Sequence, residues 1–360
     1  CRKGQVMIMG ESSIGWLNPP PMGRTLLFGS PAQPGYTFNA WIGCAKVDPE
    51  CKNCYAEREA ERGRIPTFAE AKRRHLPVWG KHAPRHFAAE STWRLPERWD
   101  RLADKAGSPR WCFGGSQMDW LEDRDDLIAS RARLISLIER TRNLRWVLLT
   151  KRPQDFARLV PSWARGVPSN VWIGISAGSQ ASLDEKYDAF AAIPSDRKVI
   201  SAEPLIGRVD FRRALRLPGL RWFLIGGENA GVGAVRPNNL EWMREALAQA
   251  YEVPTVYRYV KQLGSRVFGV PACLGCEGEM FEGAVCPVCR DVVSVALVDR
   301  DGRELHDDAG VERRAGSRYL RVMNLQHRTG EDWREWPPDL QVQEWPNGAA
   351  FIREDARAEC

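Results

Sequence analysis

The sequence predicts an α/β protein whose core is a (β/α) barrel, partial or complete, of six to seven parallel strands. Short apolar runs alternate with helical stretches from about residue 110 onward, and such alternation is typical of parallel βαβ units. The runs are nearly continuous in Val, Ile, Leu and Trp, as expected of strands buried on both faces. Because a sequence does not reveal strand order, a doubly wound open sheet stays an alternative.

The predicted elements can be placed along the chain. A first strand lies near residues 37–41, and six apolar runs follow it: 110–119, 145–153, 170–179, 198–205, 221–230 and 253–264. The clearest helices are residues 123–142 and 238–251, where apolar residues recur at three-to-four spacing. We divide the chain into an irregular leader (1–36), the barrel (37–264), a small inserted zinc-ribbon-like module (265–325), and a C-terminal closing segment and tail (326–360).

Composition limits the location and the partners of the protein. The 360 residues include 52 basic and 46 acidic ones, and the net charge of +6 permits a nucleic-acid partner without requiring one. No apolar run is long enough for a membrane span, and the first residues do not resemble a secretory signal. We therefore expect a cytoplasmic protein without a membrane partner.

Seven of the ten cysteines fall into two tight clusters, a pattern that favours metal binding over disulfides. The second cluster is Cys-x2-Cys, nine residues, then Cys-x2-Cys. Four thiolates in two such knuckles suit a tetrahedral structural Zn2+. The expected zinc ligands are Cys273, Cys276, Cys286 and Cys289.

The first cluster, in "GCAKVDPECKNCYAE" (43–57), has three cysteines, Cys44, Cys51 and Cys54. Three thiolates on a [4Fe–4S] cluster leave one iron without a protein ligand. S-adenosylmethionine (SAM) is the small molecule that best fits such an open iron, and its reductive cleavage yields a 5′-deoxyadenosyl radical. Three alternatives stay open: a zinc site completed by a histidine, a site closed by Cys112, and free cysteines.

Polar residues follow the predicted strands, at the end where parallel α/β barrels place their active sites. They are Ser116, Gln117, Asp119, Thr150, Lys151, Arg152, Ser176, Ser201, Glu203, Glu228, Asn229, Lys261 and Gln262. Strand ends are also polar wherever they meet water, so no single one of these residues identifies a site. Among them we select Lys151, Glu203 and Glu228 as candidate catalytic residues.

Several motifs occur in one order along the chain: "TFNAWIGCAKVDPECKNCYAE", "LLTKRP", "VWIGISAGSQ", "ISAEPLIG", "LIGGENAG", "YVKQLG" and "GEDWREWP". In these motifs the chain resembles a phage-protein family of unassigned function, a domain of unknown function whose three-cysteine motif is similar to that of radical SAM enzymes. The resemblance covers about residues 37–264, and "GEDWREWP" (330–337) resembles the usual C-terminal end of the family. Phe38 stands where the family usually has Trp, and the cysteine spacing of six then two departs from the three then two of most radical SAM enzymes.

The resemblance to radical SAM enzymes implies a set of cofactor contacts. "FGGSQMD" is similar to their glycine motif, so Gly114, Gly115 and Ser116 are candidates for binding the SAM amino group. By position, the remaining candidates are Tyr55 near the cluster or adenine, Lys151 and Arg152 for a carboxylate or phosphate, and Ser176, Gln180 and Glu203 for ribose, methionine carboxylate or adenine.

Two functional hypotheses follow. The first is a radical SAM-like enzyme that receives electrons from a flavodoxin-type or ferredoxin-type reductant. Its phage-type resemblance and basic balance suggest a nucleobase in DNA or RNA as substrate. The second is a non-catalytic zinc or iron–sulfur protein whose polar rim and tryptophans bind nucleic acid or a protein partner. A hydrolase using Asp119, Glu203 and Glu228 is a third, weaker possibility, because it leaves the three cysteines unexplained.

Overall fold

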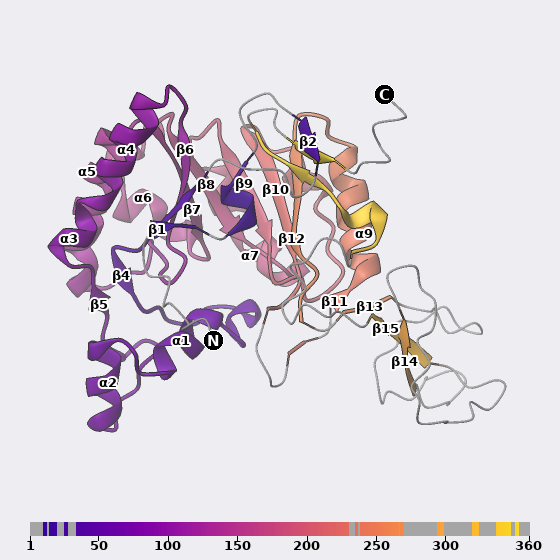
Figure 1. The fold of residues 1–360 in the computed structure, drawn as a ribbon, viewed down its shortest axis with the longest axis horizontal. Helices are drawn as coiled ribbons and strands as arrows, with labels where there is room; N and C mark the ends of the chain where they lie inside the picture. The colour runs from indigo at the N-terminus through magenta and orange to yellow at the C-terminus, as the bar shows by residue number, and fades with distance from the viewer. Residues whose placement is uncertain are drawn as a thin grey trace.

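One large, curled sheet organises the chain (Figure 1). The computed structural model describes residues 10–12, 14–19, 25–27, 34–229, 235–236, 238–265, 267–269, 294–298, 319–323, 336–346 and 350–352. The parallel strands are β3 (Tyr36–Phe38), β6 (Arg110–Gly114), β7 (Leu144–Thr150), β8 (Val171–Ser176), β9 (Lys198–Ala202), β10 (Leu220–Gly226) and β12 (Tyr257–Gln262). The predicted six to seven parallel strands are thus confirmed.

The parallel strands lie side by side in the order in which they follow along the chain. A doubly wound sheet would reverse its strand order at a switch point, and no reversal occurs from β3 to β12, so that alternative is wrong. The sheet does not close on itself, because its order begins at β1 (Gly10–Glu11) and ends at β2 (Thr25–Leu27). The fold is a half-barrel, the partial form of the expected architecture.

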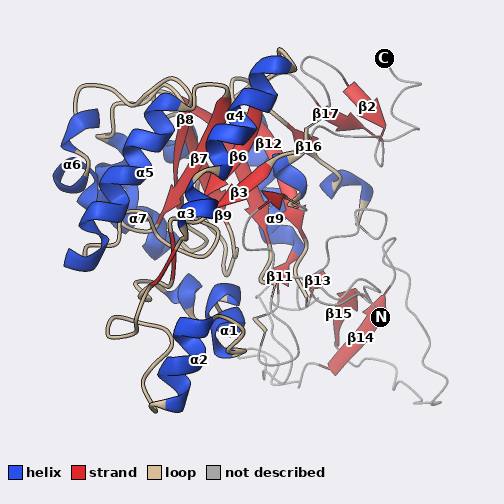
Figure 2. Cartoon of the chain, turned by 60° about the vertical axis from the view of Figure 1, so that its left-hand side comes forward, coloured by secondary structure: helices blue, strands red, loops and turns tan. Residues whose placement is uncertain are grey.

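Helices cover the outer face of the half-barrel (Figure 2). Those packed there are α3 (Glu90–Trp93), α4 (Leu95–Lys105), α5 (Ile128–Arg140), α6 (Phe156–Leu159), α7 (Gln180–Ala191), α8 (Arg212–Leu215) and α9 (Leu240–Tyr251). The predicted helices 123–142 and 238–251 correspond to α5, preceded by the 3-10 turn η3 (Asp125–Leu127), and to α9. Further 3-10 turns are η4 (Pro153–Asp155), η5 (Pro161–Trp163) and η7 (Pro338–Leu340).

Side chains alternate between the two faces of the sheet, as the pleat of a strand requires. Trp146, Ile173 and Phe223 point into the outer core beneath the helices, whereas Trp111 and Trp172 point into the half-barrel. The inner face is therefore an aromatic cluster with its own ring contacts. Every tryptophan that the structure describes is buried, so none of these indoles offers a stacking surface for nucleic acid.

Two segments from opposite ends of the sequence cover the inner face. The 3-10 turn η1 (Gly15–Leu17) places Trp16 against Phe113 and Trp222. Trp345 packs against Tyr259 and donates its indole N–H to the carbonyl oxygen of Trp16 (2.7 Å). The leader, which we expected to be irregular, thus contains strands β1 and β2 and a buried turn within its described residues.

The C-terminal segment extends the sheet beyond β12. Strand β16 (Gln343–Glu344) pairs antiparallel with β12, and β17 (Ala350–Ile352) joins β16 to β2. A separate sheet has the order β11 (Asn238–Asn239), β13 (Val267–Gly269), β15 (Tyr319–Met323) and β14 (Ser294–Val298). The predicted zinc ligands, residues 273–289, lie outside the described residues.

A small subdomain projects from the sheet between β4 (Trp41–Ile42) and β5 (His86–Phe87), which pair with each other. It contains α1 (Tyr55–Glu61) and α2 (Pro66–Arg73), set apart from the other helices (Figure 2). A buried, two-point ion pair from Arg85 to Glu122 (2.6 and 3.0 Å) attaches its base to the segment after β6. Among the described helices, none has both the length and the apolarity needed to cross a membrane.

We predict that Trp345→Ala lowers the free energy of unfolding by about 3–5 kcal/mol, because it removes a buried indole and leaves a cavity against Tyr259 and Trp16. Denaturant titration followed by circular dichroism measures the change. Leu102→Ala, at an exposed leucine on α4, is the control and should change stability by less than about 0.5 kcal/mol. Equal effects of the two substitutions would contradict the role assigned to the inner aromatic cluster.

Candidate functional site at the carboxyl ends of the strands

The three cysteines lie on the segment that follows β4, residues 43–54, which we call the cysteine loop. The loop crosses the carboxyl ends of four parallel strands. Its contacts with the segments after β6, β7, β8 and β10 are Gly43 N to Gln117 O (3.0 Å), Arg152 to Ala45 O (2.7 Å), Gly178 N to Glu50 (3.0 Å) and Asn53 to Glu228 (2.7 Å). The structure thus brings the cysteines to the predicted polar rim.

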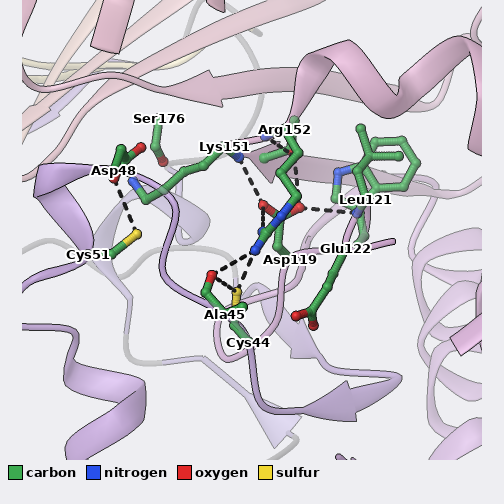
Figure 3. A network of polar contacts seen from close by, with 12 residues as sticks. Cys44, Ala45, Asp48, Cys51, Asp119, Leu121, Glu122, Lys151, Arg152 and Ser176 are labelled. Atoms are coloured by element: carbon green, nitrogen blue, oxygen red, sulfur yellow. Dashed lines mark hydrogen bonds and ion pairs between the residues drawn. The ribbon is translucent and has the colours of Figure 1, made fainter. Parts of the chain in front are cut away.

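A buried ion pair between Asp119 and Arg152 lies at the centre of this contact (Figure 3). The two charged groups are 2.7 Å apart, and each side chain is only 7% exposed. Asp119 also accepts hydrogen bonds from the Thr150 hydroxyl (2.7 Å) and from the backbone N–H groups of Lys151 (3.0 Å) and Leu121 (3.1 Å). Since all of its acceptor capacity is directed at these donors, Asp119 holds Arg152 in place rather than acting as a free carboxylate.

Arg152 in turn contacts the first cysteine. One of its terminal nitrogens lies 3.6 Å from the Cys44 sulfur, while the other binds the Ala45 carbonyl oxygen. Burial raises the pKa of the Cys44 thiol to about 12, and the nearby guanidinium only partly offsets this effect. Without a bound metal, Cys44 is therefore a protonated thiol at neutral pH.

The second cysteine is linked to a buried ion pair of its own. The Cys51 thiol donates to one oxygen of Asp48 (3.2 Å), and the Lys186 ammonium on α7 binds the other (2.6 Å). Burial alone would raise the pKa of Asp48, but Lys151 and Lys186 lower it to about 2. Lys186 also donates to the Ser176 carbonyl oxygen (2.9 Å), and Figure 3 shows the Lys151 side chain extending toward Asp48.

The donor set of the cysteine loop suits an iron–sulfur cluster, but the described side chains do not converge on one. The loop offers three free cysteines, and Cys44 and Cys54 pack against the same apolar cluster. In the described part of the chain, however, no three His, Cys, Asp or Glu side chains come together around a common point. Cluster binding would require the three cysteine side chains to converge, and the Cys51 thiol to give up its hydrogen bond to Asp48.

The alternative fourth ligands lie elsewhere. Cys112 is fully buried in the outer core beneath the helices, which separates it from the cluster of Cys44 and Cys54. His86 binds the Thr67 hydroxyl (2.9 Å) within the α1–α2 subdomain. Neither residue completes a site with the loop in this arrangement.

The two glycines after β6 have structural roles. A side chain on Gly114 would lie 2.6 Å from Leu148, in the outer core, and Gly115 has a positive φ of 126°. The Gly115 N–H already donates to the Phe38 carbonyl oxygen (3.0 Å). Close packing and the turn therefore account for both glycines without a ligand.

Tyr55 and Ser116 are brought together, as their assignment to one site requires. The Tyr55 hydroxyl donates to the Ser116 carbonyl oxygen, and the Ser116 hydroxyl accepts from the amide of the fully buried Asn39 (2.9 Å). Asn39 also accepts from the N–H of Gln117 (2.8 Å). These bonds connect the start of α1 to the loops after β3 and β6.

The two candidate catalytic glutamates are both paired with cations. Glu203 binds the Lys261 ammonium and the Gln262 amide. Glu228 accepts from the Arg236 backbone N–H (2.8 Å) and Nε (3.1 Å) and from Asn53. Burial alone would raise the pKa of Glu228, but the hydrogen bonds from Arg236 and Asn53 lower it. A group with this shift is a poor general acid, which weighs against the hydrolase hypothesis.

Three buried polar atoms at the rim have no hydrogen-bond partner within the described chain: Glu50 Oε2, Gln117 Oε1 and Ser201 Oγ. Unpaired buried polar atoms are rare and costly. Their position at the loop and at the ends of two strands is suited to a polar ligand. By contrast, a surface hollow of about 500 Å3 lies at the opposite, amino ends of β8 and β9.

Sequence reasoning did not identify Asn39, Asp48, Glu50, Asn53 or Lys186. The signal available for Asp48 and Glu50 was their position between two cysteines of one short loop. Lys186 carried no such signal, because its partner is 138 positions away and it lies on an otherwise ordinary helix.

We predict that Arg152→Met lowers the free energy of unfolding by about 3–5 kcal/mol, because it leaves Asp119 buried without its counter-charge. Urea titration of both proteins measures the difference. Arg158→Met is the matched control, since Arg158 forms ion pairs at the surface, where the loss should be much smaller. An Arg152→Met protein as stable as the control would show that the ion pair does not hold the rim together.

The lowered pKa of Glu228 predicts how the stability of the protein depends on pH. A carboxyl group whose pKa is lowered by folding adds stability above its unfolded value, and this contribution is lost as pH falls through its folded value. The wild-type protein should therefore lose stability below about pH 4.5, the usual glutamate value, more steeply than Glu228→Gln. Unfolding free energies measured from pH 7 to pH 3 test this, with the exposed Glu61→Gln as control. Parallel curves for wild type and Glu228→Gln would contradict the prediction.

Comparison with known proteins identifies the family to which the chain belongs. A family model described as "Protein of unknown function (DUF5131)" matches residues 34–308. No curated protein and no solved structure matches the chain. The matched range starts just before β3 and continues past residue 264, beyond the barrel motifs of the sequence. Because the match includes most of the chain, the protein belongs to the family described as Protein of unknown function (DUF5131).

Proposed function

We propose that the protein is a radical SAM-like enzyme whose [4Fe–4S] cluster is held by Cys44, Cys51 and Cys54. The observation that carries the proposal is the position of the cysteine loop, which crosses the carboxyl ends of the parallel strands. In parallel α/β barrels this end holds the catalytic residues. When bound, such a cluster supplies an electron at an iron without a protein ligand, where SAM fits.

The residues around the loop have roles that suit this proposal. Arg152 is held by Asp119 and donates toward the Cys44 sulfur, so it would offset the negative charge of a thiolate. The high pKa of Cys44 means that the thiol gives up its proton only when a metal binds. The buried aromatic cluster inside the half-barrel would give the site an apolar floor.

We also propose which residues at the carboxyl ends of the strands contact the cofactor. Tyr55, Ser116, Ser176 and Glu203 would contact the cofactor, and Lys151 would offer a cation beside the loop. Glu228 positions the loop through Asn53. The structural zinc, the reductant of flavodoxin or ferredoxin type, and the similarity to phage three-cysteine proteins stay parts of this proposal.

We predict that the anaerobically reconstituted protein carries about four irons per chain and releases 5′-deoxyadenosine from SAM under strong reduction. Cys54→Ala should lose the iron, because a cluster with two remaining thiolates is not held. Cys112→Ala is the matched control: it removes a buried core cysteine and should keep the iron. Iron and sulfide counts, with chromatography of the nucleoside product, measure these outcomes.

Full iron loading in Cys54→Ala would remove the basis of the proposal. Zinc in place of iron at the cysteine loop, or a cluster that leaves SAM intact, would favour the non-catalytic metalloprotein instead.

A further inference from the structure

The α1–α2 subdomain, residues 55–87, presents a basic surface beside the cysteine loop. It begins directly after Cys54 and lies apart from the helices that cover the sheet (Figures 1 and 2). Glu70 is the only acidic residue from Arg62 to His82. The exposed basic side chains in this range are Arg62, Arg64, Lys72, Arg73, Arg74 and Lys81.

Local structure accounts for part of these charges. Arg62 and Arg73 form ion pairs with Glu59 and Glu70 one helical turn away. Lys72 and Arg73 lie in the last turn of α2, where a cation is favoured by the helix dipole.

Arg64 and Lys81 have no such explanation, and Arg74, at the C-cap of α2, is favoured by the helix dipole but lacks a counter-charge. None of the three is in an ion pair within the described chain, and all are exposed. Arg64 precedes the amino end of α2, where the helix dipole disfavours a positive charge. Three exposed cations without ion pairs on one small subdomain would attract a polyanion.

The same subdomain exposes aromatic rings, although the described tryptophans are all buried. Tyr55 is 47% exposed and Phe87 is 42% exposed. Phe87 lies on β5 next to His86, whose ring contacts α2 through Thr67 and Phe68. Exposed aromatic rings and unpaired cations on the same surface are the combination by which proteins bind single-stranded nucleic acids, through base stacking and phosphate contacts.

We propose that the α1–α2 subdomain binds single-stranded nucleic acid, with phosphates at Arg64, Arg74 and Lys81 and a base stacked on Phe87. A duplex keeps its bases stacked within the helix and could not use the ring. An acidic protein would use the cations but not the ring in this way. The surface adjoins the candidate site through Tyr55, and its binding does not depend on a cluster in the cysteine loop.

The test measures binding of a fluorescein-labelled 20-nucleotide single strand by fluorescence anisotropy, in a series of KCl concentrations. The triple variant R64Q/R74Q/K81Q should bind at least about tenfold more weakly and should reduce the slope of log affinity against log salt by about 2, at roughly 0.7 per phosphate contact. Phe87→Ala should weaken binding about tenfold without changing the salt slope, because it removes stacking only.

The matched control is R212Q/R213Q/R216Q, at α8 and its C-cap, since these arginines are also exposed but lie beside Asp188, Asp210 and Glu252. It should bind like the wild type. Circular dichroism and melting curves of every variant show that the fold is intact.

Several results would overturn the proposal. One is wild-type affinity in the first triple variant, and another is an equal loss in the α8 control. Tighter binding of duplex than of single strand would exclude the stacking contact, and equal competition by polyglutamate would indicate an acidic protein as the partner. Because the assay uses neither iron nor SAM, its outcome is separate from that of the cluster experiment.

Discussion

A parallel sheet that curls without closing leaves an apolar inner face and two unpaired edges, and the rest of the molecule is arranged around that constraint. In a complete barrel, the first and last strands would pair with each other, and the strands would enclose the inner face. Here η1 and the segment around Trp345 fill the interior, and the antiparallel strands β1 and β16 cap the two sides of the parallel set. The cysteine loop lies across the carboxyl ends of the same strands.

The cysteine loop is polar and partly buried, so the charges that it buries need partners. Asp48 pairs with Lys186 of helix α7. Arg152, which follows β7 and binds the loop at Ala45, pairs with Asp119. These two buried ion pairs come from different layers of the fold and hold neighbouring parts of one loop. The geometry of the candidate site therefore depends on the packing of α7 and on β7 together, rather than on the loop sequence alone.

The strands and the main helices could be predicted from the sequence, because a strand buried on both faces is apolar at nearly every position, as in Val147–Leu149. The position of the cysteine loop at the strand ends could also be predicted from chain order. The inner aromatic cluster could not, since Trp16 and Trp345 are 329 positions apart. The roles of Gly114 and Gly115 were also not predictable, because a glycine pair fits a ligand contact and a tight turn equally well in sequence.

The hydrogen bond between Trp345 and Trp16 has a consequence for folding during synthesis. A ribosome releases the strands from β3 to β12 long before it releases Trp345, so the growing chain holds a half-barrel whose interior is covered on one side only. Exposed aromatic surface on a nascent chain favours association with chaperones and, in their absence, aggregation. A segment that is synthesised after the whole parallel set is thus the one that ends this exposure, and the core is completed only when strand β12 has been followed by the segment around Trp345.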